Sequence, residues 1–233
     1  MSERLSQKDW PKAVIMDLDG TLIDSAPDIA RALNCAFEDE GLPAFTLDEV
    51  RFMIGGGVPK LVERAFDARN MPHDDKEQVI IDGVLKHYTE APVDNTVIYD
   101  GVEHVLSTLR ARGIKVGLCT NKPQGITEVA LDQLNMTAYF DAIVGGTADT
   151  KRKPDPETLQ LCADKLGIDT DDCLLVGDSG ADRGAAEALE MTVFLVEYGY
   201  CKTPVATLSP DGVLEKMSDL LKILFPLDEI VRG

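Results

Sequence analysis

Two aspartates follow a short apolar stretch near the start of the chain, in the segment VIMDLDGTLIDS at residues 14–25. Asp17 and Asp19 stand two positions apart, and Gly20 and Thr21 directly after them indicate a turn. A carboxylate at the end of a buried strand is costly unless a cation or hydrogen bonds compensate its charge. These two aspartates are therefore the first candidates for chemistry.

Three further segments place polar side chains at or just beyond the ends of predicted strands. The segments are IKVGLCTN, CLLVGD with the GAD that follows, and the loop KRKPDP. Their polar side chains of interest are Thr120, Asn121, Lys153, Asp178 and Asp182. Since the carboxyl ends of parallel strands meet at one edge of a sheet, we expect these groups to share one crevice with the two aspartates.

The carboxylates predicted for this crevice outnumber its cations. Two like charges ~4 Å apart repel by ~1 kcal/mol in water and by ~4 kcal/mol at an effective dielectric constant of about 20. One lysine cannot compensate three or four carboxylates. Mg²⁺ can, because it commonly binds one or two carboxylates together with waters and substrate phosphate. We therefore expect a Mg²⁺ cofactor.

The other groups in the crevice suit a phosphate ester. The hydroxyl of Thr120, the amide of Asn121 and the ammonium of Lys153 are hydrogen-bond donors for phosphate oxygens. An aspartate needs no deprotonation to attack phosphorus, and aspartyl-phosphate intermediates are established chemistry. A neighbouring aspartate such as Asp19 is suited to protonate the leaving alkoxide and then to deprotonate the attacking water.

Each of these segments also has an ordinary structural interpretation. Asp-x-Asp occurs often in turns, CTN after a strand usually caps a helix, and KPDP is a common loop sequence with a solvated lysine. GDSGAD is typical of a turn before a capped helix. The functional interpretation is favoured because all four segments occur in this order, each at the end of a predicted strand or just beyond one.

The pattern of elements predicts an α/β fold. Strands are expected at residues 12–17, 114–121, 142–146, 173–178 and 192–196. Amphipathic helices alternate with the later strands, which indicates a parallel sheet covered on both faces. Helical segments are expected at residues 24–41, 46–54, 58–66, 75–90, 101–113, 124–135, 156–167, 181–191 and 216–225.

The first four helical segments interrupt the sheet directly after its first strand. We therefore expect a doubly wound, parallel-sheet, Rossmann-like core formed by residues 1–22 and 97–233. An all-helical cap domain of residues 23–96 is expected to be inserted into it. An insertion at the carboxyl end of a strand lies where open α/β sheets bind their ligands, so a lid is expected there.

Composition narrows the function classes. The net charge of −18 argues against a nucleic-acid partner, which requires a basic surface. No apolar run approaches the roughly 20 residues of a membrane span. The first residues, MSERLSQKDWPK, are polar and lack the apolar segment of a signal peptide. We therefore expect a cytoplasmic protein that contacts no membrane.

Taken together, DLDGT, TN, KP and GDSGAD resemble the four signature motifs of the haloacid dehalogenase superfamily. The helical insertion resembles the C1 cap of that superfamily, and the resemblance covers nearly the whole chain. It implies that Asp17 is a nucleophile and Asp19 a general acid and base, and that Thr120 and Lys153 bind the transferring phosphoryl group. The Mg²⁺ ligands that it implies are Asp17, Asp19 through its backbone carbonyl, Asp178 and, in a supporting position, Asp182.

Within the superfamily, the segments DLDGTLIDS, IGGGVPKLVERAF, YDGVEHVLSTLRARG and VEYGY are similar to phosphoglycolate phosphatases. This similarity implies hydrolysis of 2-phosphoglycolate to glycolate and phosphate, with a small phosphorylated metabolite as the partner of a monomer or homodimer. Three alternatives stay open: hydrolysis of another small phosphomonoester or of pyrophosphate, a sugar phosphomutase of the same fold, and an inactive regulator that binds a phosphorylated ligand.

The glycine-rich segment of the insertion is the candidate for substrate recognition. Gly56, Lys60 and Arg64 are expected to form a loop that binds a carboxylate such as that of glycolate. The alternative is a flexible connection between helices that carries solvated basic side chains.

Overall fold

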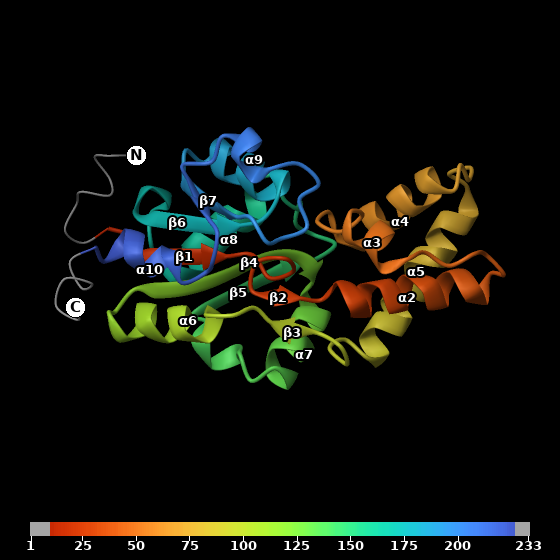
Figure 1. Ribbon diagram of the computed structural model, residues 1–233, viewed down its shortest axis with the longest axis horizontal. Coiled ribbons are helices and arrows are strands. Elements are labelled where there is room, and N and C mark those ends of the chain that lie inside the picture. Colours follow the sequence, from red (N-terminus) through yellow and green to blue (C-terminus); the bar gives the residue numbers. More distant parts are fainter. Residues whose placement is uncertain (1–9, 227–233) are drawn as a thin grey trace.

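A parallel sheet forms the centre of the larger part of the molecule, which we describe from a computed structural model that places residues 10–226 (Figure 1). Its six strands are all parallel and lie in the order β5-β4-β1-β6-β7-β8. Their bounds are β1 (Ala13–Met16), β4 (Lys115–Pro123), β5 (Ala142–Gly146), β6 (Cys173–Gly177), β7 (Thr192–Val196) and β8 (Gly212–Leu214). The α/β class predicted from the sequence is confirmed.

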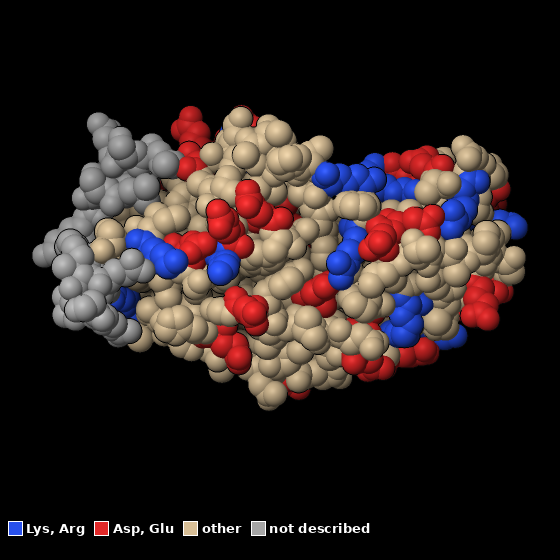
Figure 2. Space-filling model, viewed as in Figure 1, with Lys and Arg blue, Asp and Glu red and all other residues tan. Residues whose placement is uncertain are grey.

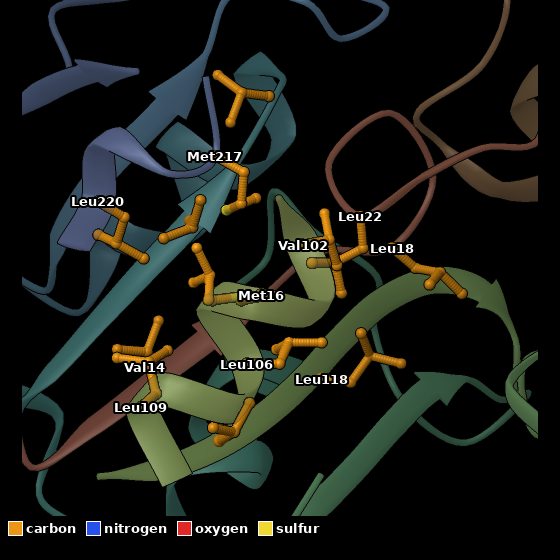
Figure 3. Packing of buried hydrophobic residues seen from close by; sticks show 14 of the residues in the cluster. Val14, Met16, Leu18, Leu22, Val102, Leu106, Leu109, Leu118, Met217 and Leu220 are labelled. Atoms are coloured by element: carbon orange, nitrogen blue, oxygen red, sulfur yellow. The ribbon is translucent and has the colours of Figure 1, made fainter. Parts of the chain in front are cut away.

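Helices cover both faces of this sheet. They are α6 (Val102–Ala111), α7 (Gln124–Gln133), α8 (Glu157–Leu166), α9 (Gly180–Ala188) and α10 (Asp219–Leu224). Val14 and Met16 of β1 belong to the buried cluster that α6 and α10 contribute to (Figure 3), whereas Ala13 and Ile15 pack into the cluster formed with α8 and α9. Because successive side chains of a strand point to opposite faces, β1 has no position left for a polar residue.

The edge of the sheet departs from the sequence-based expectation. The five predicted strands are present, and the structure adds β8, which pairs in parallel with β7. Three residues are too few to give a periodic apolar pattern, so the sequence carried no signal for this strand. Short 3₁₀ segments occur at Thr137–Tyr139, Thr170–Asp172 and Val205–Leu208.

Four helices between β1 and β4 lie beside the part of the molecule that contains the sheet (Figure 1) and form a third hydrophobic cluster, to which Ile126 of α7 also belongs. They are α2 (Ala26–Asp39), α3 (Leu47–Arg51), α4 (Gly57–Ala68) and α5 (Asp75–Glu90). Ile29, Leu33 and Phe37 of α2 are buried in this cluster, as their spacing predicts. We call residues 26–90 the helical unit. The predicted domain limits stay a prediction, and residues 1–9 and 227–233 of the predicted core lie outside the described residues.

Two short strands connect the helical unit to the sheet. β2 (Ile23–Asp24) and β3 (Val97–Ile98) pair in an antiparallel manner, which sequence analysis did not predict because each has only two residues. The buried carboxylate of Asp28 accepts hydrogen bonds from the backbone N–H of Asn95 at 2.9 Å and the hydroxyl of Thr96 at 2.7 Å. These bonds fasten the segment that leaves the helical unit to the helix that enters it.

Charged side chains of both signs are interspersed on the face of the molecule that Figure 2 draws, and its basic side chains lie mainly over the helical unit. No continuous basic surface is present on that face, as the net charge of −18 leads one to expect. Within residues 10–226, no helix is long and apolar enough to cross a membrane.

Candidate active site

Three adjacent strands bring the predicted site residues to one edge of the sheet. β1 lies between β4 and β6, and the three strands run in the same direction. Asp17 directly follows β1, Thr120 lies in the last part of β4, and Asp178 directly follows β6. All three side chains are buried. Residues far apart in the sequence therefore meet in one crevice, as the order of the motifs predicts.

Asp17, Asp178 and Asp182 form a group of buried carboxylates, which we call the acidic cluster. Each offers one oxygen that lies within 4.8 Å of the others. Burial raises the pKa of Asp17 to about 6 against the opposing effect of Lys153. Burial and the charges of the other two aspartates raise the pKa of Asp178 well above its ordinary value. The cluster therefore holds more negative charge than its surroundings compensate.

Lys153 supplies the positive charge in contact with the acidic cluster. Its Nζ lies 3.1 Å from Oδ1 of Asp17 and 2.6 Å from Oδ1 of Asp182, and it also donates to the carbonyl of Cys119 at 2.7 Å. Burial alone would lower the pKa of Lys153, but the two carboxylates raise it above its ordinary value. One ammonium thus faces three carboxylates, and Asp178 forms no ion pair with any residue in 10–226.

The donor atoms of the acidic cluster fit a hard divalent cation. Both oxygens of Asp182 already accept hydrogen bonds, from Lys153 at 2.6 Å and from the hydroxyl of Ser179 at 2.7 Å. One oxygen each of Asp17 and Asp178, Oδ2 and Oδ1 respectively, accepts none from the part of the chain that the structure describes. Carboxylate oxygens are ligands that Mg²⁺ prefers. Asp17 and Asp178 can therefore bind such an ion directly, with Asp182 in support.

Gly20 is needed for the turn that directly follows Asp17 and Asp19. Its φ is +83°, a conformation that residues with a Cβ rarely adopt. A side chain at this position would also collide with the carboxylate of Asp178 and meet the ring of Tyr200 at 2.9 Å. The glycine of DLDGT therefore provides both the backbone conformation and the space that the close approach of Asp178 requires.

Asp19 lies beside the acidic cluster and has partners of its own. Its Oδ1 accepts hydrogen bonds from the hydroxyl of Ser25 at 2.6 Å and from Nζ of Lys122 at 3.0 Å. Sequence analysis did not single out Lys122, which is buried and also contacts the hydroxyl of Tyr88 in α5. β4 continues to Pro123, two residues beyond the predicted strand end. The one feature of the sequence that could have pointed to Lys122 is its position directly after Thr120 and Asn121.

Thr120 and Asn121 have different positions although they are neighbours. Thr120 lines the cavity above the strand ends. The amide nitrogen of Asn121 donates to the carbonyls of Lys153 at 2.9 Å and Gly55 at 3.1 Å, and its amide oxygen accepts from the backbone N–H of Lys153 at 2.9 Å. Asn121 therefore holds the Lys153 loop in place. Its expected contact with phosphate stays a prediction.

A cavity lies between the strand ends and the helical unit. Its wall on the side of the sheet consists of Asp17, Asp19, Thr120, Asn121, Lys122 and Pro123. Its wall on the side of the helical unit carries only one polar side chain, that of Tyr88. This second wall consists of Ile29, Ile54, Gly55, Gly57, Val58, Leu61, Val84 and Tyr88.

Lys60 and Arg64, which the sequence analysis expected to meet the substrate, do not line this cavity. Lys60 forms an ion pair with Glu63, and Arg64 donates to the backbone carbonyls of residues 53–54 at 2.8 and 3.0 Å. Both line a neighbouring groove, as does Gly56. Lys153 of the site lines the same groove, and Arg64 stabilises the loop that precedes α4. The expected contact of Lys60 and Arg64 with the substrate stays a prediction.

The fold and the site define a class of proteins: a doubly wound parallel sheet whose strand ends carry buried carboxylates and a lysine beneath an inserted helical unit. The profile of one family, described as "Haloacid dehalogenase-like hydrolase", matches residues 14–196. The chain belongs to this family. This confirms the superfamily and the hydrolase class expected from the motifs.

Individual relatives agree with this assignment over nearly the whole chain. A phosphoglycolate phosphatase of Cereibacter sphaeroides is 40% identical over 215 residues, which cover 91% of this chain and 98% of the relative. One of Rhodospirillum rubrum is 38% identical over 215 residues, covering 90% and 89%. The crystal structure of a predicted phosphoglycolate phosphatase from Haemophilus somnus superposes with a TM-score of 0.84 at 30% identity, covering 91% of this chain and 97% of that one.

Proposed function

We propose that this chain is a Mg²⁺-dependent phosphomonoester hydrolase whose substrate is 2-phosphoglycolate. The observation that carries the reaction class is the buried acidic cluster in contact with Lys153, with Asp19 beside it at the same sheet edge. The substrate is inferred from the names of relatives that align with 91% of this chain.

In the first half-reaction, an oxygen of Asp17 attacks phosphorus, and the bond between phosphorus and the glycolate oxygen breaks. Lys153 and Thr120 bind the phosphoryl oxygens. The ammonium of Lys153 is buried 3.1 Å from Asp17, so water screens its charge little where negative charge develops. Asp19 gives its proton to the departing glycolate oxygen.

In the second half-reaction, Asp19 takes a proton from water, and the water oxygen attacks phosphorus of the aspartyl phosphate. The bond between phosphorus and the Asp17 oxygen breaks, which releases phosphate and regenerates both aspartates. Removal of the proton by a positioned carboxylate typically accelerates such a step by about 10²–10⁴-fold.

Mg²⁺ is proposed to bind to Asp17, Asp178 and the backbone carbonyl of Asp19, with Asp182 in support. When bound, the ion supplies positive charge to the acidic cluster and to the substrate phosphate. This agrees with the excess of carboxylates over ammonium groups among the buried residues of the crevice.

The helical unit is proposed to act as the cap that covers the substrate and excludes water. Gly55 and Gly57 of the glycine-rich segment line the cavity, and α4 begins at Gly57, where backbone N–H groups have no acceptor within the helix. These N–H groups are donors for the carboxylate of 2-phosphoglycolate. The domain limits at residues 23–96, the cytoplasmic location and the monomeric or homodimeric state stay predictions.

The test is release of inorganic phosphate from a panel of esters, with Mg²⁺ and with EDTA. The panel consists of 2-phosphoglycolate, ethyl phosphate, p-nitrophenyl phosphate, pyrophosphate and a hexose phosphate. We expect hydrolysis that EDTA abolishes and Mg²⁺ restores, with the highest kcat/KM on 2-phosphoglycolate. Undiminished turnover in EDTA would contradict the metal. A preference for pyrophosphate, or an isomerised hexose phosphate without free phosphate, would replace the proposed reaction by another.

A further inference from the structure

Lys122 is a buried cation at the boundary between the sheet and the helical unit. Only 1% of its side chain is exposed. An ammonium removed from water is costly unless acceptors surround it, so the partners of Lys122 must compensate its charge as those of Lys153 do. They are the carboxylate of Asp19, 3.0 Å from Nζ, and the hydroxyl of Tyr88. Asp19 and Tyr88 raise the pKa of Lys122 to about 12 although burial alone would lower it.

The contacts of Lys122 distinguish the two oxygens of Asp19. Oδ1 accepts two hydrogen bonds, from Lys122 at 3.0 Å and from the hydroxyl of Ser25 at 2.6 Å, whereas Oδ2 has a longer contact of 3.4 Å with Lys122. A carboxylic acid that carries its proton on one oxygen still accepts hydrogen bonds on the other. The oxygen that remains for proton transfer is therefore Oδ2.

These contacts join three parts of the fold. Asp19 lies in the turn after β1, Lys122 lies in β4, and Tyr88 lies in α5 of the helical unit. The ring of Tyr88 is also 4.2 Å from Nζ of Lys122, a distance at which an aromatic face attracts a cation. The helical unit thus contacts Asp19 through Lys122.

We propose that Lys122 is a positioning residue for the general acid and base. Together with Ser25 it holds Oδ1 of Asp19, so that Oδ2 carries the proton to the leaving oxygen as the bond from phosphorus to that oxygen breaks. Oδ2 then receives the proton of the attacking water. Tyr88 holds Lys122 in place from the helical unit. This inference rests on the role proposed for Asp19, and it does not make Lys122 a ligand of the substrate.

The leaving group separates this role from the alternatives. An alkoxide such as glycolate or ethoxide needs a proton to leave, whereas p-nitrophenolate leaves without one. Because kcat/KM reports the steps up to departure of the leaving group, it is not affected by later attack of water. We expect Lys122→Met to lower kcat/KM by about 10–100-fold on 2-phosphoglycolate and on ethyl phosphate, part of the full general-acid effect. On p-nitrophenyl phosphate we expect a loss below about threefold.

The comparison variants fix the interpretation. Asp19→Asn should show the same dependence on the leaving group with larger losses, and adding Lys122→Met to it should change kcat/KM little further, because a residue that acts through another is not additive with it. Lys165→Met removes an exposed lysine of α8 and should leave all three substrates unchanged. Tyr88→Phe removes only the hydroxyl that contacts Lys122 and should give a weaker form of the same pattern. It provides the test if Lys122→Met does not fold.

Each other outcome overturns the inference. A loss confined to 2-phosphoglycolate would make Lys122 a group that recognises the substrate carboxylate. Equal losses on all three esters in folded variants, or no loss, would make it a structural residue. If wild type released no phosphate from any ester, or if Asp19→Asn were fully active, the proposed function itself would be contradicted. If Asp19→Asn were impaired but Lys122→Met fully active, only the role of Lys122 would be contradicted.

Discussion

The two walls of the cavity differ in chemistry and in how their side chains are held. The wall on the side of the sheet consists mainly of polar side chains, and both carboxylates in it, those of Asp17 and Asp19, contact a lysine and either a backbone N–H or a hydroxyl. The wall from the helical unit consists of aliphatic side chains and glycines, with Tyr88 as its polar exception. The first wall suits charge stabilisation and proton transfer, and the second suits exclusion of water.

This difference assigns two tasks to two regions. The sheet edge carries the groups that we propose for phosphoryl transfer, and none of these groups depends on what the phosphate is attached to. If these roles hold, discrimination among esters is expected to come from the helical unit, which we propose covers the rest of the substrate. The two regions are linked where Tyr88 contacts Lys122 and where Asn121 donates to the carbonyl of Gly55.

The largest effects are expected at the two aspartates on the side of the sheet. Asp17→Asn removes the attacking oxygen and should leave no measurable turnover of any ester. Asp19→Asn keeps the attack but loses proton transfer, so kcat/KM on 2-phosphoglycolate should fall by about 10²–10⁴-fold. Phosphate release gives both values, and circular dichroism shows whether the variants are folded. Near-normal activity of either variant would contradict the catalytic role proposed for that aspartate.

Gly20→Ala should impair the acidic cluster at the same sheet edge through geometry alone. The left-handed φ of +83° costs a residue with a Cβ about 1–2 kcal/mol, and displacement of Asp178 by the added methyl adds overpacking of about 1–3 kcal/mol. We expect a free energy of unfolding lower by about 2–5 kcal/mol, and about 10–100-fold weaker Mg²⁺ activation because a metal ligand moves.

Gly113→Ala is the matched control for this variant. Its φ of +76° is similar, but no atom lies within 4 Å of the position of an added Cβ. It should lower the free energy of unfolding by only about 1–2 kcal/mol and leave Mg²⁺ activation unchanged. Equal effects of the two variants on Mg²⁺ activation would show that contact with Asp178 is irrelevant to the metal.

The metal-free protein should show the excess charge of the acidic cluster as a dependence of stability on pH. The pKa of Asp17 is raised from 3.8 to about 6, so the folded state binds a proton more tightly than the unfolded state. Ionisation of Asp17 therefore lowers the free energy of unfolding as pH rises from about 4 through 6. The loss is about 3 kcal/mol once the carboxyl is fully ionised. Asp17→Asn removes this cost.

Thermal unfolding in EDTA measures this difference. The midpoint of Asp17→Asn should exceed that of wild type at about pH 7.5, and the two should converge as pH falls toward about 4. Saturating Mg²⁺ should stabilise wild type more than the variant at about pH 7.5, because the ion compensates the carboxylate that the variant lacks. A gap that is independent of pH would place the origin of the effect elsewhere.

The sheet side of the cavity could be predicted from the sequence, and the helical side could not. Asp17 and Asp178 directly follow short apolar strands, so the parallel arrangement alone brings them together. Lys122 gave no such signal, because its role depends on Asp19 and on Tyr88, which the fold brings to it from two distant segments. The strand β8 and the pair of β2 and β3 were missed because two or three residues carry no periodicity.

The assignment of Lys60 and Arg64 to the substrate stays a prediction, because the sequence does not show how the helical unit packs. Both are basic and follow a glycine-rich segment, so sequence analysis assigned them to the substrate carboxylate. The sequence did not reveal which way each helix turn faces the sheet, nor that Arg64 has backbone carbonyls as acceptors within its own unit. Charge and spacing thus predicted a cationic segment, whereas the packing of the helices determines which cavity or groove its side chains line.

Lys60→Ala should therefore have the smallest effect of the variants considered. The ammonium of Lys60 pairs with Glu63 on the exposed side of α4 and does not line the cavity, so its removal costs a surface ion pair of about 0–1 kcal/mol. We expect kcat/KM to change less than about threefold on 2-phosphoglycolate and equally little on the uncharged ethyl ester. Glu63→Ala, which removes the partner, is the matched control and should behave alike. A charge-assisted hydrogen bond to the substrate is worth about 1.5–3 kcal/mol. A selective loss of about 10–100-fold on 2-phosphoglycolate in Lys60→Ala alone would therefore show that α4 does bring a cation to the substrate carboxylate, and the helical side would then take part in charge recognition as well as in covering the site.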